Sequence, residues 1–117
     1  MTRLTLTLLV IRSSDIEVLK NFYENFGMEF RREQHGNGPV HYSTILDGMV
    51  LEIYPITAPE QIADKNRLGF KVEHLDAVVA ELKKQHIPIL SLPKQTPLGL
   101  RATIKDPEER VVELYQA

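Results

Sequence analysis

The sequence contains no cysteine and no tryptophan. Without cysteine, disulfides, cysteine-ligated zinc and thiol catalysis are excluded, and a reducing compartment is compatible with the composition. Long apolar runs are missing as well, since residues 4–11 are interrupted by Thr5 and Thr7 and followed by Arg12 and Asp15. Such a run is too short and too polar for a membrane span or a secretory leader. We therefore expect a cytoplasmic protein with no membrane partner.

An excess of positive charge is also absent. The chain has 14 Lys and Arg against 16 Asp and Glu, for a formal net charge of −2. Because phosphate contacts require a basic face, we expect no nucleic-acid partner. The 117 residues, 43% of them hydrophobic, are enough for one domain with its own core.

One short pattern occurs twice in the chain. Residues 50–55 read VLEIYP and residues 111–116 read VVELYQ, so that Glu52 and Tyr54 recur as Glu113 and Tyr115 at the same interval. In each copy a glutamate interrupts an apolar strand pattern. A repeat at a fixed interval indicates two copies of one supersecondary unit.

The first half of the chain is predicted to fold as β-α-β-β-β. A strand covers residues 4–11, and a helix starts at Ser14, with Glu17 completing a capping box, and stops at Gly27. Asp47-Gly48 is typical of a two-residue hairpin turn. The remaining strands are predicted at residues 28–33, 41–46 and 49–54.

The second half repeats this order. Asp76 is predicted to cap its helix, and Pro88 stops the helix and interrupts the strand that follows. The strands are predicted at residues 68–72, 87–92, 101–105 and 110–115. The expected fold is α+β: two βαβββ modules in tandem, forming a curved mixed sheet around a central hollow. The first module covers residues 1–55, residues 56–66 are a connection, and residues 67–117 form the second module.

The hairpin predicts which side chains share a sheet face. Pairing across Asp47-Gly48 sets Ser43 against Glu52 and His41 against Tyr54, all on one side. A register slip of one residue would move His41 and Ser43 to the other side. In the second module, Leu100 and Ala102 are expected near the equivalent places.

With these modules in place, the sequence resembles the vicinal oxygen chelate superfamily, which comprises glyoxalases, bleomycin-resistance proteins and extradiol dioxygenases. The resemblance covers nearly the whole chain. It is carried by the paired modules, by FYENFGM at residues 22–28, and by Asp106-Pro107 followed by Val112-Glu113-Leu114. It implies a small-molecule site with four metal ligands, two from each module, and often a homodimer.

Only two of the four implied ligand positions hold a metal-binding residue, namely Glu52 and Glu113. The first-strand position falls on Leu8, or on Leu6 or Thr7, and the fifth-strand position falls on Arg67. A guanidinium has no lone pair to offer a cation. We therefore expect no cofactor and disfavour a divalent metal, for which Glu52 and Glu113 would be the ligands. The hypothesis is a metal-free hollow in which Arg67 pairs with both glutamates.

The candidate site residues have two sets of expected roles. Glu52, His41 and Glu113 are the catalytic candidates, because carboxylates and imidazole can move protons. The candidates for binding a substrate are Arg67, His35, Ser43, Tyr54, Tyr115 and Arg101. Structural ion pairing is the competing interpretation of the charged members, and His35 is equally consistent with a plain loop residue.

Several functions remain open at this point. The chain is predicted to bind a small molecule in the hollow, either as a metal-independent lyase or isomerase, or as a drug or metabolite sequestration protein. A metal-dependent glyoxalase-like lyase or dioxygenase would use Glu52, Glu113 and a histidine. A dimerising or regulatory module without small-molecule chemistry is a further alternative. A homodimer is the preferred assembly.

Overall fold

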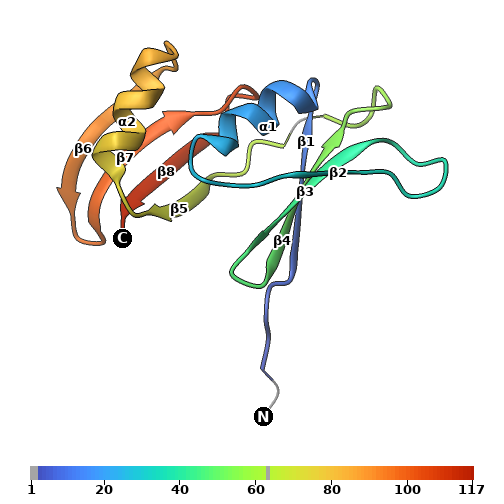
Figure 1. Cartoon of the computed structure of the whole chain (residues 1–117), viewed down its shortest axis with the longest axis horizontal. Coiled ribbons are helices and arrows are strands. Elements are labelled where there is room, and N and C mark those ends of the chain that lie inside the picture. The colour runs from blue at the N-terminus through green and yellow to red at the C-terminus, as the bar shows by residue number, and fades with distance from the viewer. Residues whose placement is uncertain (1–2, 63) are drawn as a thin grey trace. The chain divides into compact units, whose positions relative to one another are not determined.

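Two units of similar construction make up the chain. The computed structural model describes residues 3–62 and 64–117, and the chain divides into Met1–Asp64 and Lys65–Ala117. Each unit contains one four-stranded sheet and one helix (Figure 1). The predicted α+β class and the tandem βαβββ order are confirmed. The arrangement around a central hollow stays a prediction.

The first unit has the strand order β1-β4-β3-β2. Strand β1 runs parallel to β4, whereas β2 and β3, and β3 and β4, are antiparallel. Its elements are β1 (Leu8–Ser13), α1 (Ile16–Glu24), β2 (Arg31–Glu33), β3 (His41–Leu46) and β4 (Met49–Pro55).

The second unit repeats this topology in the order β5-β8-β7-β6. Strand β5 is parallel to β8, and the other pairs are antiparallel. Its elements are β5 (Leu68–Val72), α2 (Leu75–Lys84), β6 (Ile89–Thr96), β7 (Gly99–Lys105) and β8 (Val111–Gln116).

Each helix covers one face of its own sheet. Helix α1 packs on β1, β3 and β4, and α2 packs on β6 and β8. The buried apolar side chains alternate along the strands, as Leu51 and Ile53 do in β4 and Val112 and Leu114 in β8. Because alternate residues of a strand point to opposite faces, Glu52 and Glu113 lie on the faces away from the helices. We call these two helix-free faces the open faces.

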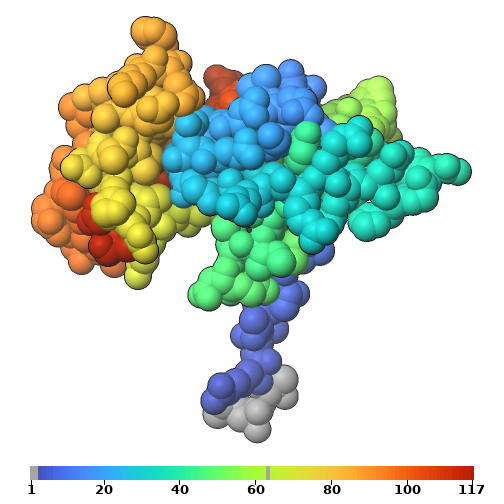
Figure 2. All heavy atoms as spheres, viewed as in Figure 1, coloured from blue at the N-terminus to red at the C-terminus, as the bar shows by residue number. Residues whose placement is uncertain are grey.

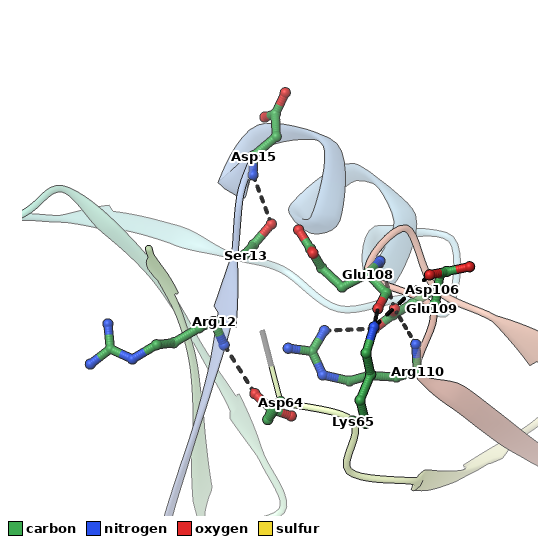
Figure 3. A network of polar contacts seen from close by, with 9 residues as sticks. All are labelled: Arg12, Ser13, Asp15, Asp64, Lys65, Asp106, Glu108, Glu109 and Arg110. Atoms are coloured by element: carbon green, nitrogen blue, oxygen red, sulfur yellow. Dashed lines mark hydrogen bonds and ion pairs between the residues drawn. The ribbon is translucent and has the colours of Figure 1, made fainter. Parts of the chain in front are cut away.

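Both helix starts differ from the prediction. Asp15, not Ser14, is the N-cap of α1, and its carboxylate accepts hydrogen bonds from the backbone of Glu17 and Val18. The Asp15 backbone in turn donates to Ser13 Oγ at 3.0 Å (Figure 3). The N-cap of α2 is His74, so Asp76 lies inside the first turn. Neighbouring residues of the same polar type make the capping position ambiguous from sequence.

Strand β1 begins later than predicted. Its register with β4 starts with Leu8 opposite Val50, and just before it the Thr7 carbonyl accepts a hydrogen bond from the Val50 backbone N–H at 2.8 Å. The segment before β1 stands out from the rest of its unit (Figure 2), and Leu4 is 99% exposed. Strand β2 is likewise shorter than predicted, and β6 starts after Pro88.

Candidate functional site

The open face of the first unit is organised in rows that cross the strands. One row is apolar and joins Leu8, Val50 and Ile45. The next row joins Val10, Glu52 and Ser43. The third row contains Arg12, Tyr54, His41 and Glu33, at the end of the sheet that carries the loop between β2 and β3. Polar chemistry is thus concentrated at one end of this face.

The predicted register of the β3–β4 hairpin is confirmed. Ser43 lies opposite Glu52. The rings of His41 and Tyr54 are stacked, with centroids 4.2 Å apart and planes inclined by 10°. The structure therefore brings together four of the predicted residues, His41, Ser43, Glu52 and Tyr54.

His41 has an unusual environment for a strand histidine. Only 1% of the residue is exposed, and its Nδ1 lies 3.2 Å from the Pro39 carbonyl oxygen. Its Nε2 has no hydrogen-bond partner, although Glu33 Oε1 is 3.4 Å away and Glu52 Oε2 is 3.6 Å away. The ring of His35 approaches to 5.1 Å. A buried ring nitrogen thus faces two carboxylates without bonding to either.

Two residues of this cluster were missed by the sequence analysis. Glu33 pairs with His41 across β2 and β3, which a correct register for the short strand β2 would have revealed. The Arg12 guanidinium lies 6.0 Å from the Tyr54 ring centroid and donates to the Pro55 carbonyl. Burial raises the pKa of the Tyr54 hydroxyl, and the nearby Glu52 and Glu33 raise it further. Tyr54 is therefore a neutral, ring-stacking residue at physiological pH.

The open face of the second unit is predominantly basic. Glu113 lies opposite Gly69 and Thr103, and Tyr115 lies opposite Lys71 and Arg101. The Tyr115 hydroxyl donates to Glu113 Oε1 at 2.5 Å. Arg67 Nε is 2.5 Å from Glu113 Oε2, and Arg101 Nη1 is 3.6 Å from Oε1. The carboxylate therefore accepts a hydrogen bond from Tyr115 and forms ion pairs with two guanidinium groups.

The expected neighbours of Glu113 in β7 were wrong by one residue. Thr103 and Arg101, not Ala102 and Leu100, occupy the places equivalent to Ser43 and His41. The cause is the turn between β7 and β8, where Lys105 pairs with Val111 across a longer loop than Asp47-Gly48. The second unit therefore has an arginine where the first has a histidine.

The family's metal position does not fit the residues present. Arg67 lies just before β5 and directs its Nε to Glu113, so this carboxylate already pairs with a cation that cannot itself bind a metal. Leu8, at the first-strand position, supplies no donor atom. The predicted contact of Arg67 with Glu113 is present, and its pairing with Glu52 stays a prediction.

The charge on Glu113 predicts a pH-dependent stability difference. The hydrogen bond from Tyr115, followed by Arg67 and Arg101, lowers the pKa of this carboxyl below its usual value. A lowered folded-state pKa adds stability above the unfolded pKa of about 4.3 and loses it as the pH falls through the folded value. We expect Glu113→Gln to be less stable than wild type at pH 7 and the gap to narrow below about pH 4. Urea unfolding across pH 3 to 7 checks this, and a constant gap would contradict it.

Within residues 3–62 and 64–117, no helix combines the length and the apolar character that crossing a membrane requires. No match to the chain is found among curated proteins.

Comparison with solved structures finds relatives of similar length. TnmS3, an antibiotic binding protein from Streptomyces sp. CB03234, is 26% identical, with a TM-score of 0.76 over 99% of this chain and 98% of its own. A glyoxalase/bleomycin resistance protein from the same organism is also 26% identical, with a TM-score of 0.71 over 96% and 100%. Lactoylglutathione lyase from Agrobacterium tumefaciens shares the fold at 15% identity, with a TM-score of 0.69 over 97% and 93%.

The family model for the Glyoxalase/Bleomycin resistance protein/Dioxygenase superfamily matches residues 5–114. This match spans both βαβββ units and includes every candidate site residue except Tyr115. The chain belongs to the Glyoxalase/Bleomycin resistance protein/Dioxygenase superfamily.

Proposed function

We propose that this protein is a cytoplasmic binding protein for a small, partly aromatic molecule with an anionic oxygen, and that it needs no metal at the family's position. The proposal rests on the Nε atom of Arg101, a buried donor that has no hydrogen-bond partner. Another nitrogen of the same guanidinium, Nη1, lies 3.6 Å from Glu113 Oε1. Buried donors are nearly always satisfied, so an unpaired one on an open face indicates a ligand acceptor.

The surroundings of Arg101 support an anionic, planar ligand. Lys71, Tyr115 and Lys94 share its cross-strand row, so that the row carries three cations around one phenol ring. A guanidinium binds carboxylate or phenolate oxygens with paired donors, and a tyrosine ring offers a stacking surface. TnmS3, a relative at 26% identity, is an antibiotic binding protein, which supports a small-molecule ligand.

A variant pair tests this proposal. We expect Arg101→Gln to weaken binding of an aromatic carboxylate or phenol at least about tenfold, the loss of one charge-assisted hydrogen bond. Lys84→Gln removes an exposed charge from the end of α2, outside this row, and is expected to change affinity less than about threefold. Titration calorimetry with hits from a panel of aromatic acids, phenols and antibiotics measures both. Equal affinities for the two variants, or no binding by wild type at millimolar concentration, would overturn the proposal.

An enzyme is the second candidate, favoured by the contact of His41 with Glu52. An imidazole 3.6 Å from a carboxylate is suited to proton transfer, as a metal-independent lyase or isomerase requires. Glu52→Gln separates the two functions. Turnover lost with binding retained would favour the enzyme, whereas a modest change in affinity alone would favour the binding protein.

We also propose that the protein forms a homodimer. Leu4 and Leu6, in the segment before β1, and Leu8 in β1 are exposed and alternate along the chain, as the apolar side of an extended segment does. Exposed apolar side chains gathered in one segment are typical of interaction surfaces. Light scattering measures the molar mass, and a monomer at all concentrations would refute this assembly.

A further inference from the structure

We infer that Glu33, His35 and His41 form a binding site for a divalent transition-metal ion of the Zn²⁺ type. This site lies in the first unit, and its three ligands differ from the four implied ligand positions of the family, although one of those positions, Glu52, lies beside it. Its potential ligand atoms all lie within 4.8 Å of one another. Glu33 belongs to β2 and His41 to β3, and the two are cross-strand partners. His35 lies in the loop that joins these strands.

In its neutral form, His41 has the tautomer that leaves the lone pair of Nε2 available to bind a metal. Nδ1 is 3.2 Å from the Pro39 carbonyl, which can only accept a hydrogen bond, so the proton belongs on Nδ1. The lone pair is then on Nε2. Metal-binding histidines commonly have their second nitrogen held in this way by a carbonyl.

The spacing around Nε2 matches a coordination sphere better than a hydrogen bond. Glu33 Oε1 is 3.4 Å and Glu52 Oε2 is 3.6 Å from Nε2, and neither makes a hydrogen bond with it. With metal–ligand bonds of 2.0–2.2 Å, two ligands of a tetrahedral ion are about 3.3–3.6 Å apart. A lone pair facing two carboxylates is unfavourable, and a bound metal ion, or in the competing state a proton on Nε2, relieves it.

The chemistry of the ligand set and the access to it are also suitable. Two imidazoles with one carboxylate is a common set for zinc, and it leaves a position for water or for an oxygen of a ligand. His41 is buried and Glu33 is half-buried, while His35 is exposed in a loop containing Gly36 and Gly38. An ion can therefore enter from the loop side. Binding would tie this loop to β3, and Glu52 is close enough to complete the sphere.

Zinc titration of tag-free protein stripped with a chelator tests the site. We expect calorimetry to show one Zn²⁺ bound per chain. His35→Ala should bind zinc at least about tenfold more weakly, because even the loss of a residue that only hydrogen-bonds to a metal ligand weakens metal binding by that much. His35 is exposed, so this variant keeps the fold. Glu33→Gln preserves shape but removes the anionic ligand and is expected to weaken binding similarly. His74→Ala removes another exposed histidine, one that makes no side-chain capping bond, and is expected to bind as wild type does.

The competing state is a protonated His41 that holds the two carboxylates without a metal. In that case wild type binds no stoichiometric Zn²⁺, and the inference is overturned. It is overturned equally if His35→Ala and Glu33→Gln bind Zn²⁺ as tightly as wild type. The proposed organic ligand is left out of the titration, and Arg101→Gln is expected to bind zinc normally. Failure of the zinc site is therefore distinguishable from failure of the proposed function.

Discussion

Asp106→Ala is expected to lower the free energy of unfolding by roughly 3–5 kcal/mol, the range for leaving one member of a buried ion pair without its partner. Asp106 and Arg110 have fully buried side chains, and Arg110 Nη1 lies 3.0 Å from Asp106 Oδ2. Figure 3 shows both residues in the turn between β7 and β8. The variant would leave the arginine charge inside the protein.

The same carboxylate also organises the turn. Its Oδ1 accepts hydrogen bonds from the backbone of Glu108 and Arg110, both at 2.9 Å. Glu109 has a positive φ of 65° in this turn, a conformation that a non-glycine residue adopts only when its surroundings hold it there. The loss of these contacts adds to the cost of the unpaired charge.

Two matched variants separate these contributions. Asp106→Asn keeps an oxygen for the turn but loses the negative charge, and Arg110→Met replaces the cation with an apolar side chain of similar length. The double variant should recover stability relative to the sum of the single changes, because no buried charge is left unpaired. Urea denaturation of wild type, Asp106→Ala, Asp106→Asn, Arg110→Met and the double variant measures this. Additive losses, or a loss below about 1 kcal/mol for Asp106→Ala, would show that the pair is not the stabilising element.

The repeat made the fold predictable in outline. The recurrence of Glu52 and Tyr54 as Glu113 and Tyr115 indicated two equal modules, and strict alternation assigned each glutamate to the face without a helix. Asp47-Gly48 fixed the β3–β4 register because a two-residue turn permits few pairings. Each of these signals comes from residues close together in the sequence, so packing of the rest of the unit does not change it.

Features set by partners elsewhere in the chain were less predictable. Strand β1 begins where β4 can pair with it, a limit that its own residues do not encode. The turn held by Asp106 is longer than a two-residue hairpin, which moved Arg101 and Thr103 onto the open face in place of their neighbours. A repeat in the sequence does not reveal the length of each turn, and the turn length decides which residues of a strand lie on the open face.

The same limit applies to the candidate site. His41, Ser43, Glu52 and Tyr54 come from one hairpin and could be grouped from sequence. His35 was also a candidate from the sequence, whereas Glu33 was not, because its pairing with His41 depends on the register of the short strand β2. The pairing of a short strand across a loop of several residues depends on the register, which periodicity alone does not fix.

Variants on the two faces of the first sheet are expected to have different effects. Changes on the helix-covered face should lower stability, whereas changes in the cluster around His41 should weaken zinc binding. Tyr23, in the FYENFGM stretch, is fully buried and packs edge-to-face with Phe22 and Phe26, with ring centroids 5.0 and 5.9 Å apart. Tyr23→Ala is expected to lower the free energy of unfolding by about 3–5 kcal/mol, because it leaves a cavity and breaks both aromatic contacts. Tyr23→Phe retains the ring and isolates the contribution of the hydroxyl group, for which we expect about 1 kcal/mol.

The decisive measurement compares stability with zinc binding in the same variants. Tyr23 lies in α1 and belongs to the helix-covered face, whereas His35 and Glu33 belong to the cluster around His41. At a temperature where Tyr23→Ala remains folded, its zinc affinity should stay within about threefold of wild type, since only the folded state binds and it is still populated. His35→Ala should show the reverse, near-normal stability with weakened zinc binding. A large loss of zinc affinity in folded Tyr23→Ala would mean that the helix face positions the ligands, and the two faces would have to be treated as one coupled unit.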